Sequence, residues 1–400
     1  MNNTRGKRQL KTERNQAVYP VLHMVFWCAY AIIWGYTAVY LGHYGYSSGV
    51  VGLVTGAGAV ISVLLQPLLA YMVKKGRNLT TGKLLFVLKI IAIAVALWMW
   101  GEPSGKWTVA ILFMILAAIE VTIPSMLSTL AMNHVNSGHR INYGAARGLG
   151  SVAYALASFA LGYLVKQMEI RWFALLYVVL SLFFLLFCVL FREMPEAVGS
   201  ENSLSALEEQ KQMGIMKKYP FLLYFLVGTV LLFMGHNMIN IFLVNIIEEV
   251  GGNSENLGVA IAIAATLELP IMAYFNRLAE KIDVRKLLVF SSVCFLVKCI
   301  LTYLSGNLMM IYLAQTVQIA AFGLFTPASV HFINVFMKRK DSGIGQALLG
   351  AFSLGLGGAL GNVIGGFVLE RFGASGMLLV TILLSASGLL FIIKSVFSIR

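Results

Sequence analysis

Residues 267–274 read Leu-Glu-Leu-Pro-Ile-Met-Ala-Tyr, which places the Glu268 carboxylate inside an apolar segment long enough to cross a lipid bilayer. A related stretch, Gln-Pro-Leu-Leu-Ala-Tyr, occupies residues 66–71, and its Pro67 lies 203 residues before Pro270. A charge inside a membrane costs several kcal/mol unless it faces a partner or a cavity, so such an acid is a functional candidate. We therefore expect a chain organised around two related helices, one of which carries a buried carboxylate.

The composition is that of a membrane protein. Of the 400 residues, 59% are hydrophobic and only 12% are charged, and the mean hydropathy is +0.82. Soluble domains carry about twice that charged fraction. Apolar runs of about 20 residues recur along the whole chain, and such runs cross bilayers as helices. Because the runs do not alternate, a β-barrel is not expected. The predicted fold class is an all-α polytopic membrane protein.

Twelve transmembrane spans are predicted, six on each side of a polar stretch. A basic cytoplasmic tail (1–18) precedes an N-terminal six-helix half (19–191), a central cytoplasmic loop (192–218) and a C-terminal six-helix half (219–400). The expected spans are 19–41, 50–73, 84–100, 108–132, 143–165, 172–191, 220–246, 257–276, 287–305, 308–336, 344–369 and 375–397.

Lysine and arginine mark one side of the membrane. The tail, residues 74–77, the central loop, residues 281–286 and residues 338–340 carry most of them, and the positive-inside rule places these loops in the cytoplasm. We therefore expect a multi-pass protein of the cytoplasmic membrane with both termini inside the cell. The net charge of +13 follows from this topology, so nucleic-acid binding is not expected.

The offset of 203 residues recurs. Residues 117–125, which contain Pro124, match residues 320–328, which contain Pro327. The two matches relate span two to span eight and span four to span ten. Parallel repeats of this kind predict two six-helix pseudo-repeats with a solute site between them near the midplane. Glycines spaced about four residues apart in spans five and eleven predict close helix packing.

Twelve spans arranged as six plus six, with a long central loop, resemble the major facilitator superfamily. Leu64-Leu65-Gln66-Pro67-Leu68 and the run from Ala146 to Tyr154 resemble the lactose permease and its oligosaccharide–proton symporter relatives. That resemblance implies that Arg147 binds sugar hydroxyls and that Tyr154 stacks on a sugar ring. Lys298 stands where that family has an arginine in span nine.

Other stretches resemble different members of the same cluster. Leu267-Glu268-Leu269-Pro270 and residues 315–323 resemble bacterial sugar efflux transporters, and the phenylpropionate permease group belongs to the same cluster. The span-four carboxylate of the lactose permease falls at Thr129 here, and the His and Glu that carry proton coupling in its span ten fall near Gln318 and Ala321. These departures argue against lactose as the solute.

Three ionisable residues are candidates for proton coupling or gating. Glu268 and Lys298 lie at comparable depths in spans eight and nine, so an ion pair between them is expected, with either a coupling or a structural role. Glu120 in span four is the other deep acid and must avoid lipid. Lys89 in span three is interpreted as a snorkelling or packing charge.

Polar side chains within the spans supply candidates for solute binding. Besides Arg147 and Tyr154, they are His236, Asn240, Gln315 and Gln318. His236 and Asn240 lie one helical turn apart, as do Gln315 and Gln318, so each pair shares a helix face. The alternative is that each is an internally bonded polar residue.

The sequence contains no Walker-type phosphate loop and no metal-ligand or nucleophile motif, so no enzyme activity, metal or cofactor is expected. The expected function is proton-coupled secondary transport of a small polar organic solute, with a sugar or oligosaccharide favoured and a monomer as the working unit. Its expected partners are the solute, protons and the bilayer. Proton-antiport efflux of sugars or drugs is the alternative within the transporter class, and a non-transporting membrane receptor is the alternative outside it.

Overall fold

The computed structural model describes residues 2–76, 79–101, 103, 105–137, 141–191 and 214–399. Helices dominate these ranges, and no strand occurs within them. The predicted central loop lies outside the described residues as far as residue 213, and residues 214–218 are helical. The segment predicted as a basic tail is the first part of a helix that begins at Asn2.

The N-terminal half consists of seven α-helices and a short π-helix. They are α1 (Asn2–Tyr30), η1 (Ala31–Gly35), α2 (Thr37–His43), α3 (Ser48–Lys75), α4 (Thr81–Trp100), α5 (Lys106–Asn136), α6 (Tyr143–Gln167) and α7 (Arg171–Leu190). Side chains define several of the starts. Thr80 accepts a hydrogen bond from the Lys83 N–H, and Asn142 accepts one from the Ala145 N–H. Such N-caps satisfy amides that have no partner inside the helix.

The C-terminal half has a similar order of helices. They are α9 (Pro220–Ile241), α10 (Leu243–Glu249), α11 (Ser254–Lys281), α12 (Val284–Tyr303), α13 (Leu308–Thr316), η2 (Val317–Ile319), α14 (Phe322–Phe336), α15 (Arg339–Gly350), η3 (Ala351–Gly357) and α16 (Gly358–Phe397). Asn253, Asp283 and Asn307 cap α11, α12 and α13 through their side-chain oxygens.

The described helices account for the twelve predicted spans. Ten segments are long and apolar enough to cross a membrane, and the last of them, Arg339–Phe397, has 59 residues. That segment runs through α15, η3 and α16. Gly373, where φ is 71°, divides α16 and so separates the segment into two spans. Glycine suits this position because a Cβ disfavours positive φ. Counting the segment as two spans and adding the 20-residue helix α12 gives twelve.

The predicted repeat is visible in the helices. α4 and α12 each have 20 residues, and their first residues, Thr81 and Val284, lie 203 apart. α3 and α11 each have 28 residues and enclose Pro67 and Pro270. Pro124 lies inside the unbroken helix α5, whereas the equivalent tenth span is divided into α13, η2 and α14. The two-repeat fold is confirmed, with a break that only the second repeat has.

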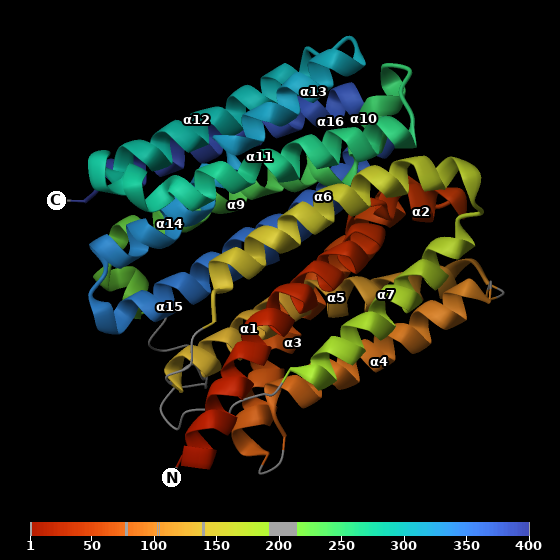
Figure 1. The fold of residues 1–400 in the computed structure, drawn as a ribbon. Helices are drawn as coiled ribbons and strands as arrows, with labels where there is room; N and C mark the ends of the chain where they lie inside the picture. The colour runs from red at the N-terminus through yellow and green to blue at the C-terminus, as the bar shows by residue number, and fades with distance from the viewer. Residues whose placement is uncertain are drawn as a thin grey trace.

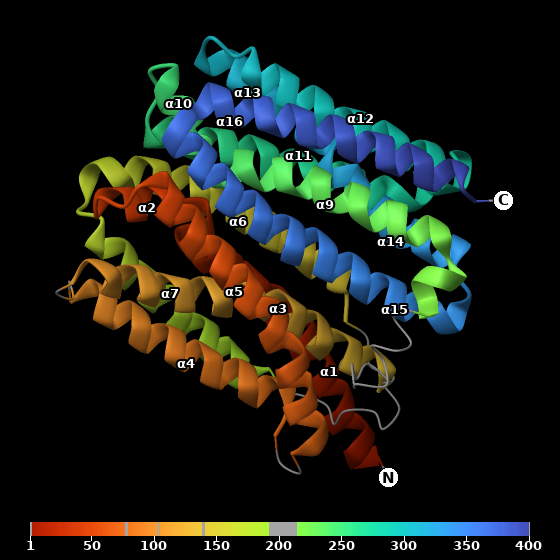
Figure 2. The same cartoon turned by 180° about the vertical axis from the view of Figure 1, so that it is seen from behind.

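The two halves form a V. In Figure 1 the C-terminal half lies above the N-terminal half, and the view from behind in Figure 2 shows the same arrangement. The halves meet at the end that carries α2 and α10 and spread apart toward the end where both chain termini lie. α6 packs along α11, and α3 packs along the first part of α16.

Glycine allows close backbone contact where the halves meet. A Cβ on Gly52 of α3 would lie 2.3 Å from the Asn362 carbonyl oxygen of α16, and a Cβ on Gly258 of α11 would lie 2.6 Å from the Ser158 carbonyl oxygen of α6. Contacts this short leave no room for any side chain. Small residues permit such approaches between membrane helices. Gly366, one of the spaced glycines of span eleven, makes a similar approach, since a Cβ there would lie 2.3 Å from the Ser48 carbonyl oxygen of α3.

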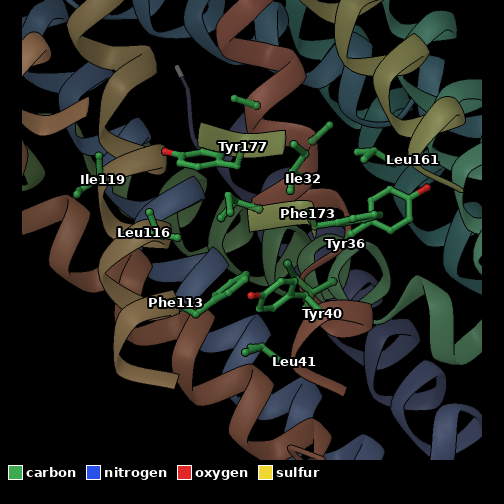
Figure 3. Close-up of a cluster of buried hydrophobic side chains, with 14 of the residues drawn as sticks. Ile32, Tyr36, Tyr40, Leu41, Phe113, Leu116, Ile119, Leu161, Phe173 and Tyr177 are labelled. Carbon is green, nitrogen blue, oxygen red and sulfur yellow. The ribbon is translucent and has the colours of Figure 1, made fainter. Parts of the chain in front are cut away.

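The N-terminal half has a core rich in tyrosine and phenylalanine. Figure 3 shows Tyr36, Tyr40, Phe113, Phe173 and Tyr177 packed with aliphatic side chains from neighbouring helices. All five are buried. The buried hydroxyls of Tyr36 and Tyr177 have hydrogen-bond partners, as is usual for buried polar groups. For example, Tyr36 donates a 2.6 Å hydrogen bond to the Ser158 carbonyl oxygen. This core holds the helices of the N-terminal half together, and the other faces of some of these helices contact the C-terminal half.

Candidate functional site

Three side chains of the C-terminal half form a hydrogen-bonded chain. Lys298 Nζ of α12 donates to Gln318 Oε1 of η2 at 2.6 Å, and Gln318 Nε2 donates to Glu268 Oε1 of α11 at 2.8 Å. Lys298 and Gln318 are almost fully buried, whereas Glu268 is partly exposed. The direct Lys298–Glu268 ion pair expected from the sequence is not formed, because Gln318 stands between the two charges.

Gln318 lies in a break of its helix. The α-helical hydrogen bonding of α13 gives way to a 3₁₀ turn at Val317–Ile319, and Ala321 has the non-helical angles φ −77° and ψ −93°. Short 3₁₀ stretches inside a span often mark functional hinges, and interrupted helices often surround transporter sites. The break explains why a residue of the tenth span can reach both α11 and α12.

Arg147 of α6 lies in the N-terminal half, across the α6–α11 interface from these three hydrogen-bonded side chains. Its guanidinium lies 4.1 Å from the Trp27 ring centroid, and its Nη1 donates to Ser151 Oγ at 2.9 Å. The positive charge of Arg147 acts on Glu268 across the interface between α6 and α11. Gly150 makes room for Trp27, since a Cβ there would lie 2.3 Å from the Trp27 Cδ1. Arg147 is therefore held by stacking and by Ser151, and is directed at the opposite half.

Aromatic rings border Arg147. Trp27 packs edge-on against Tyr154, with ring centroids 6.1 Å apart, and Tyr30 lies 6.2 Å from Tyr154 and stacks on Trp34. The structure thus brings Arg147 and Tyr154 together, as the resemblance implied. Trp27 was not selected from the sequence, yet its ring packs against the Arg147 guanidinium.

His236 of α9 forms a second polar group in the C-terminal half. Its Nε2 pairs with Asn240 Nδ2 at 2.8 Å, and its ring stacks on Phe322 at 4.8 Å with an angle of 8° between the planes. The buried donors His236 Nδ1 and Gln315 Nε2 have no hydrogen-bond partner among the described residues. The Lys298 charge also acts on His236. Of the predicted solute-binding residues, His236 and Asn240 are therefore bonded to each other, Gln318 is bonded to Lys298, and His236 and Gln315 retain unused donors.

Glu120 belongs to a different cluster inside the N-terminal half. Its Oε1 accepts a hydrogen bond from Lys89 Nζ at 2.5 Å and another from the Tyr177 hydroxyl, and both Lys89 and Glu120 are fully buried. In Figure 3 the Tyr177 hydroxyl points toward the helix that carries Ile119. The ammonium of Lys89 also lies over the Phe26 and Phe184 rings. Of the two roles expected for Lys89, the snorkelling charge is wrong and the packing charge fits, because Lys89 is fully buried and a deep carboxylate gives it a partner.

Two polar contacts join the halves where they meet. Glu370 Oε2 of α16 accepts hydrogen bonds from the Ser47 hydroxyl and the Gly49 N–H, both at 2.9 Å, and so caps the start of α3. Lys166 of α6 lies 2.9 Å from Glu255 of α11. A carboxylate near a helix N-terminus complements the helix dipole. In both contacts the carboxylate comes from the C-terminal half.

Among the described residues, no group of three or more His, Cys, Asp or Glu side chains could hold a metal ion. The arrangement between the halves instead offers two cations, one partly exposed carboxyl group, several amides and stacked aromatic rings. These groups can bind polar solutes and exchange a proton, and covalent chemistry is not indicated.

Comparison with known proteins identifies the family. A model described as the MFS_1 like family, in which MFS denotes the major facilitator superfamily, matches residues 17–382. The chain belongs to this family. Its members are transporters, and the protein is a multi-pass membrane transporter rather than an enzyme.

Two curated transporters are similar over most of the chain. The maltose permease of Geobacillus stearothermophilus is 26% identical over 359 residues, which cover 89% of this transporter and 88% of the permease. The probable 3-phenylpropionic acid transporter of Escherichia coli (strain K12) is 23% identical over 353 residues, which cover 88% and 90%.

Solved structures share the fold. A mutant of the nucleoside transporter NupG has a TM-score of 0.82 at 14% identity and covers 96% of this transporter and 100% of its own chain. A bacterial homolog of the human lysosomal transporter Spinster, in an inward-facing and unoccupied conformation, has a TM-score of 0.69 at 12% identity and covers 97% and 98%. At these identities the likeness concerns the fold alone.

Proposed function

We propose that this MFS transporter carries a small polar organic solute, such as a sugar or oligosaccharide, into the cell together with a proton. The observation that carries the proposal is the half-buried Glu268 on α11, which accepts a hydrogen bond from Gln318 and lies on the helix that packs along α6, the helix of Arg147, in the opposite half. Only a group at this interface changes its surroundings when two rigid halves rock. The similarity to a maltose permease favours a sugar.

Glu268 and Arg147 suggest how the proton and the solute are coupled. While Glu268 is ionised, it attracts the guanidinium toward the C-terminal half. A proton on Glu268 removes that attraction, and Arg147 is then free to donate hydrogen bonds to solute hydroxyls. Arginine suits this role because its planar fork offers five donors in fixed directions. Proton binding then precedes solute binding, which is the order that symport needs.

The remaining solute contacts come from both halves. Tyr154, together with Trp27, offers ring faces on which a sugar can stack, and His236, Asn240 and Gln315 offer hydrogen-bonding groups from the other half. Gln318 joins them only if it leaves Lys298 or Glu268, since both ends of its amide are already bonded. Closing the halves around a solute brings the two sets together.

The charge pattern of the loops supports placing the termini in the cytoplasm. With that orientation, the end where α2 and α10 lie faces outward and is closed, and the halves spread toward the cytoplasm (Figures 1 and 2). This arrangement is an inward-facing state. The transporter then works as a monomer in the cytoplasmic membrane.

A second candidate solute is an organic acid. Arg147 and Lys298 provide two positive charges at the site, whereas Glu268 provides one negative charge. Neither cation forms an ion pair among the described residues. A carboxylate solute would balance the excess, and one similar protein is a probable 3-phenylpropionic acid transporter.

Uptake into proteoliposomes tests the function. Vesicles that contain the purified protein are given labelled maltose or 3-phenylpropionate, with and without an acidic outer solution. Accumulation that needs the acidic exterior, and that a protonophore abolishes, supports symport. Extrusion driven by the same gradient would indicate antiport efflux instead, and binding without movement of either probe would indicate a receptor.

The variant Glu268→Gln tests the proton assignment. We expect it to exchange solute across the membrane at equal pH but to lose accumulation driven by a pH gradient. Gradient-driven accumulation at the wild-type level in this variant would contradict the assignment to Glu268.

A further inference from the structure

The buried lysines of the two halves have different kinds of hydrogen-bond acceptor. Each half has a lysine on its third span that donates a short hydrogen bond to its fourth span. Lys89 Nζ lies 2.5 Å from Glu120 Oε1, and Lys298 Nζ lies 2.6 Å from Gln318 Oε1. In the N-terminal half the acceptor is a carboxylate. In the C-terminal half the acceptor is the Gln318 amide, and the Glu268 carboxylate is bonded to the other end of that amide.

We propose that Gln318 is a positioning residue that keeps Lys298 from pairing directly with Glu268 and so leaves Glu268 able to take up a proton. The inference rests on the proposed role of Glu268 as the proton site. A carboxylate in direct contact with an ammonium group strongly favours its ionised form. An amide between them transmits part of the attraction and still allows the acid to become neutral.

The amide is oriented by the charges at its two ends. Its oxygen accepts from Lys298, and its nitrogen donates to Glu268. A glutamine can make both bonds at once because it has an acceptor and a donor at opposite corners of one planar group. A carboxylate, hydroxyl or apolar side chain at residue 318 lacks this combination.

The helix break allows Gln318 to occupy this place. In the N-terminal half, α5 runs through the equivalent depth without interruption, and Glu120 contacts Lys89 directly. In the C-terminal half, the 3₁₀ turn of η2 places Gln318 between α11 and α12. A Cβ on the neighbouring Gly323 would lie 2.8 Å from the Ile271 side chain and 3.4 Å from the Glu268 Cα. The broken helix therefore lies close against α11 beside the acid.

The charged groups around Glu268 come from two packed elements. Arg147 and Tyr154 face it from α6, and Lys298 faces it from α12. His236 of α9 is affected by Lys298. Arg147 belongs to the opposite half and moves relative to Glu268 when the halves rock. Lys298 belongs to the same half and stays, so its separation by Gln318 acts in every state of the transport cycle.

The two possible roles of Gln318 predict shifts of opposite sign. If Gln318 were only a hydrogen-bond donor to the carboxylate, its loss would favour the protonated acid, and Glu268 would titrate at higher pH. If Gln318 is a spacer, a smaller side chain at residue 318 lets Lys298 contact Glu268. The ammonium group then stabilises the ionised carboxylate, so Glu268 titrates at lower pH.

The test is an infrared titration of the purified full-length protein in lipid. Glu268 is followed by the C=O stretch of its protonated carboxyl group, which is identified as the band that Glu268→Gln removes. We expect Gln318→Ala to lower the pH at which this band is half-developed by about one unit or more, the size that a close opposite charge produces. Gln318→Ser, which keeps a polar group in the helix break, gives the same sign and provides a second variant.

A matched control removes the cation. In the double variant Gln318→Ala with Lys298→Met, the acid shift disappears, because nothing is left to approach Glu268. An unchanged or alkaline shift in both single variants would overturn the spacer role. So would an acid shift that persists without Lys298. The titration needs no solute, so these outcomes are distinct from a failure of proton-coupled transport, which the vesicle assay detects separately.

Discussion

Glu370 caps a helix of the opposite half: its carboxylate accepts a 2.9 Å hydrogen bond from the N–H of Gly49, which lies 321 residues earlier. The same oxygen accepts from Ser47. A Cβ on Gly49 would lie 2.3 Å from Glu370 Oε2, so a larger residue there would displace the carboxylate from this cap. These contacts join the two halves at the end where α3 meets α16, so we expect them to favour the state in which that end is closed.

Replacing Glu370 by alanine should open that end more often. Loss of a partly exposed capping carboxylate costs about 1 kcal/mol, which corresponds to about a fivefold change in the equilibrium. A cysteine at Asn362, which is fully buried between the halves, reports the opening. In a background without the native cysteines, we expect Asn362→Cys to react about five times faster with a membrane-impermeant maleimide when Glu370→Ala is added. Equal rates would show that the cap does not influence the closed state.

Gly52 should tolerate no side chain. In Gly52→Ala the added methyl group meets the Asn362 carbonyl, a backbone atom that cannot move independently. We expect the closed end to be blocked and solute uptake to fall at least tenfold, while the protein remains folded. Gly350→Ala is the matched control, because a Cβ at this helical glycine meets nothing within 4 Å. Uptake should survive in the control, and similar losses in both variants would contradict the packing argument.

The Lys89–Glu120 pair should matter for stability. Removing one partner of a buried ion pair leaves an uncompensated charge and costs about 3–5 kcal/mol. We expect Lys89→Met to lower the thermal unfolding temperature in detergent, and the double variant Lys89→Met with Glu120→Gln to recover most of the loss. The sequence also suggested a proton or gating role for Glu120. A changed pH dependence of uptake in the folded double variant would support that role, and an unchanged one would limit Glu120 to stability.

Arg147 should act through its planar fork. Arg147→Lys keeps the charge but loses the paired donors and the flat group that stacks on Trp27. We expect solute binding to weaken by about tenfold, the equivalent of about 1.4 kcal/mol, with little change in thermal stability. Arg171→Lys, at the start of α7 and away from the site, is the control. Isothermal titration with the transported probe measures the solute affinity of both variants. Unchanged affinity in Arg147→Lys would remove Arg147 from the solute site.

The helices and their repeat could be predicted from sequence because hydrophobic length and proline position are local properties. Pro67 and Pro270 lie inside α3 and α11, as their shared offset implied. The glycine spacing also identified close contacts correctly, since glycine is the only residue that fits a backbone approach of this kind. The division of the tenth span at Gln318 was not predicted, because residues 308–336 form one continuous apolar run long enough to cross the membrane.

The pairing of charges could not be predicted. Hydropathy gives the depth of Lys89, Glu120, Glu268 and Lys298 but not the rotation of each helix about its axis. Rotation decides that Lys89 meets Glu120 and that Gln318 separates Lys298 from Glu268. A partial signal was present, because Lys89 and Glu120 carry opposite charges on the adjacent spans three and four. The contact of Arg147 with Trp27 depends on the space that Gly150 leaves for the indole ring, and no sequence pattern predicted it.

The proposed proton role of Glu268 has a consequence for the response to voltage. The Lys89–Glu120 pair is electrically neutral, so the membrane potential exerts no net pull on it. The group formed by Arg147, Lys298 and Glu268 carries one positive charge with the acid ionised and two with the acid protonated. A potential of 100 mV acts on each elementary charge with about 2.3 kcal/mol across the full membrane. With Glu268 as the proton site, we expect a negative interior to draw the protonated form inward more strongly than the deprotonated form, and so to give the cycle a direction even where the pH is equal on both sides.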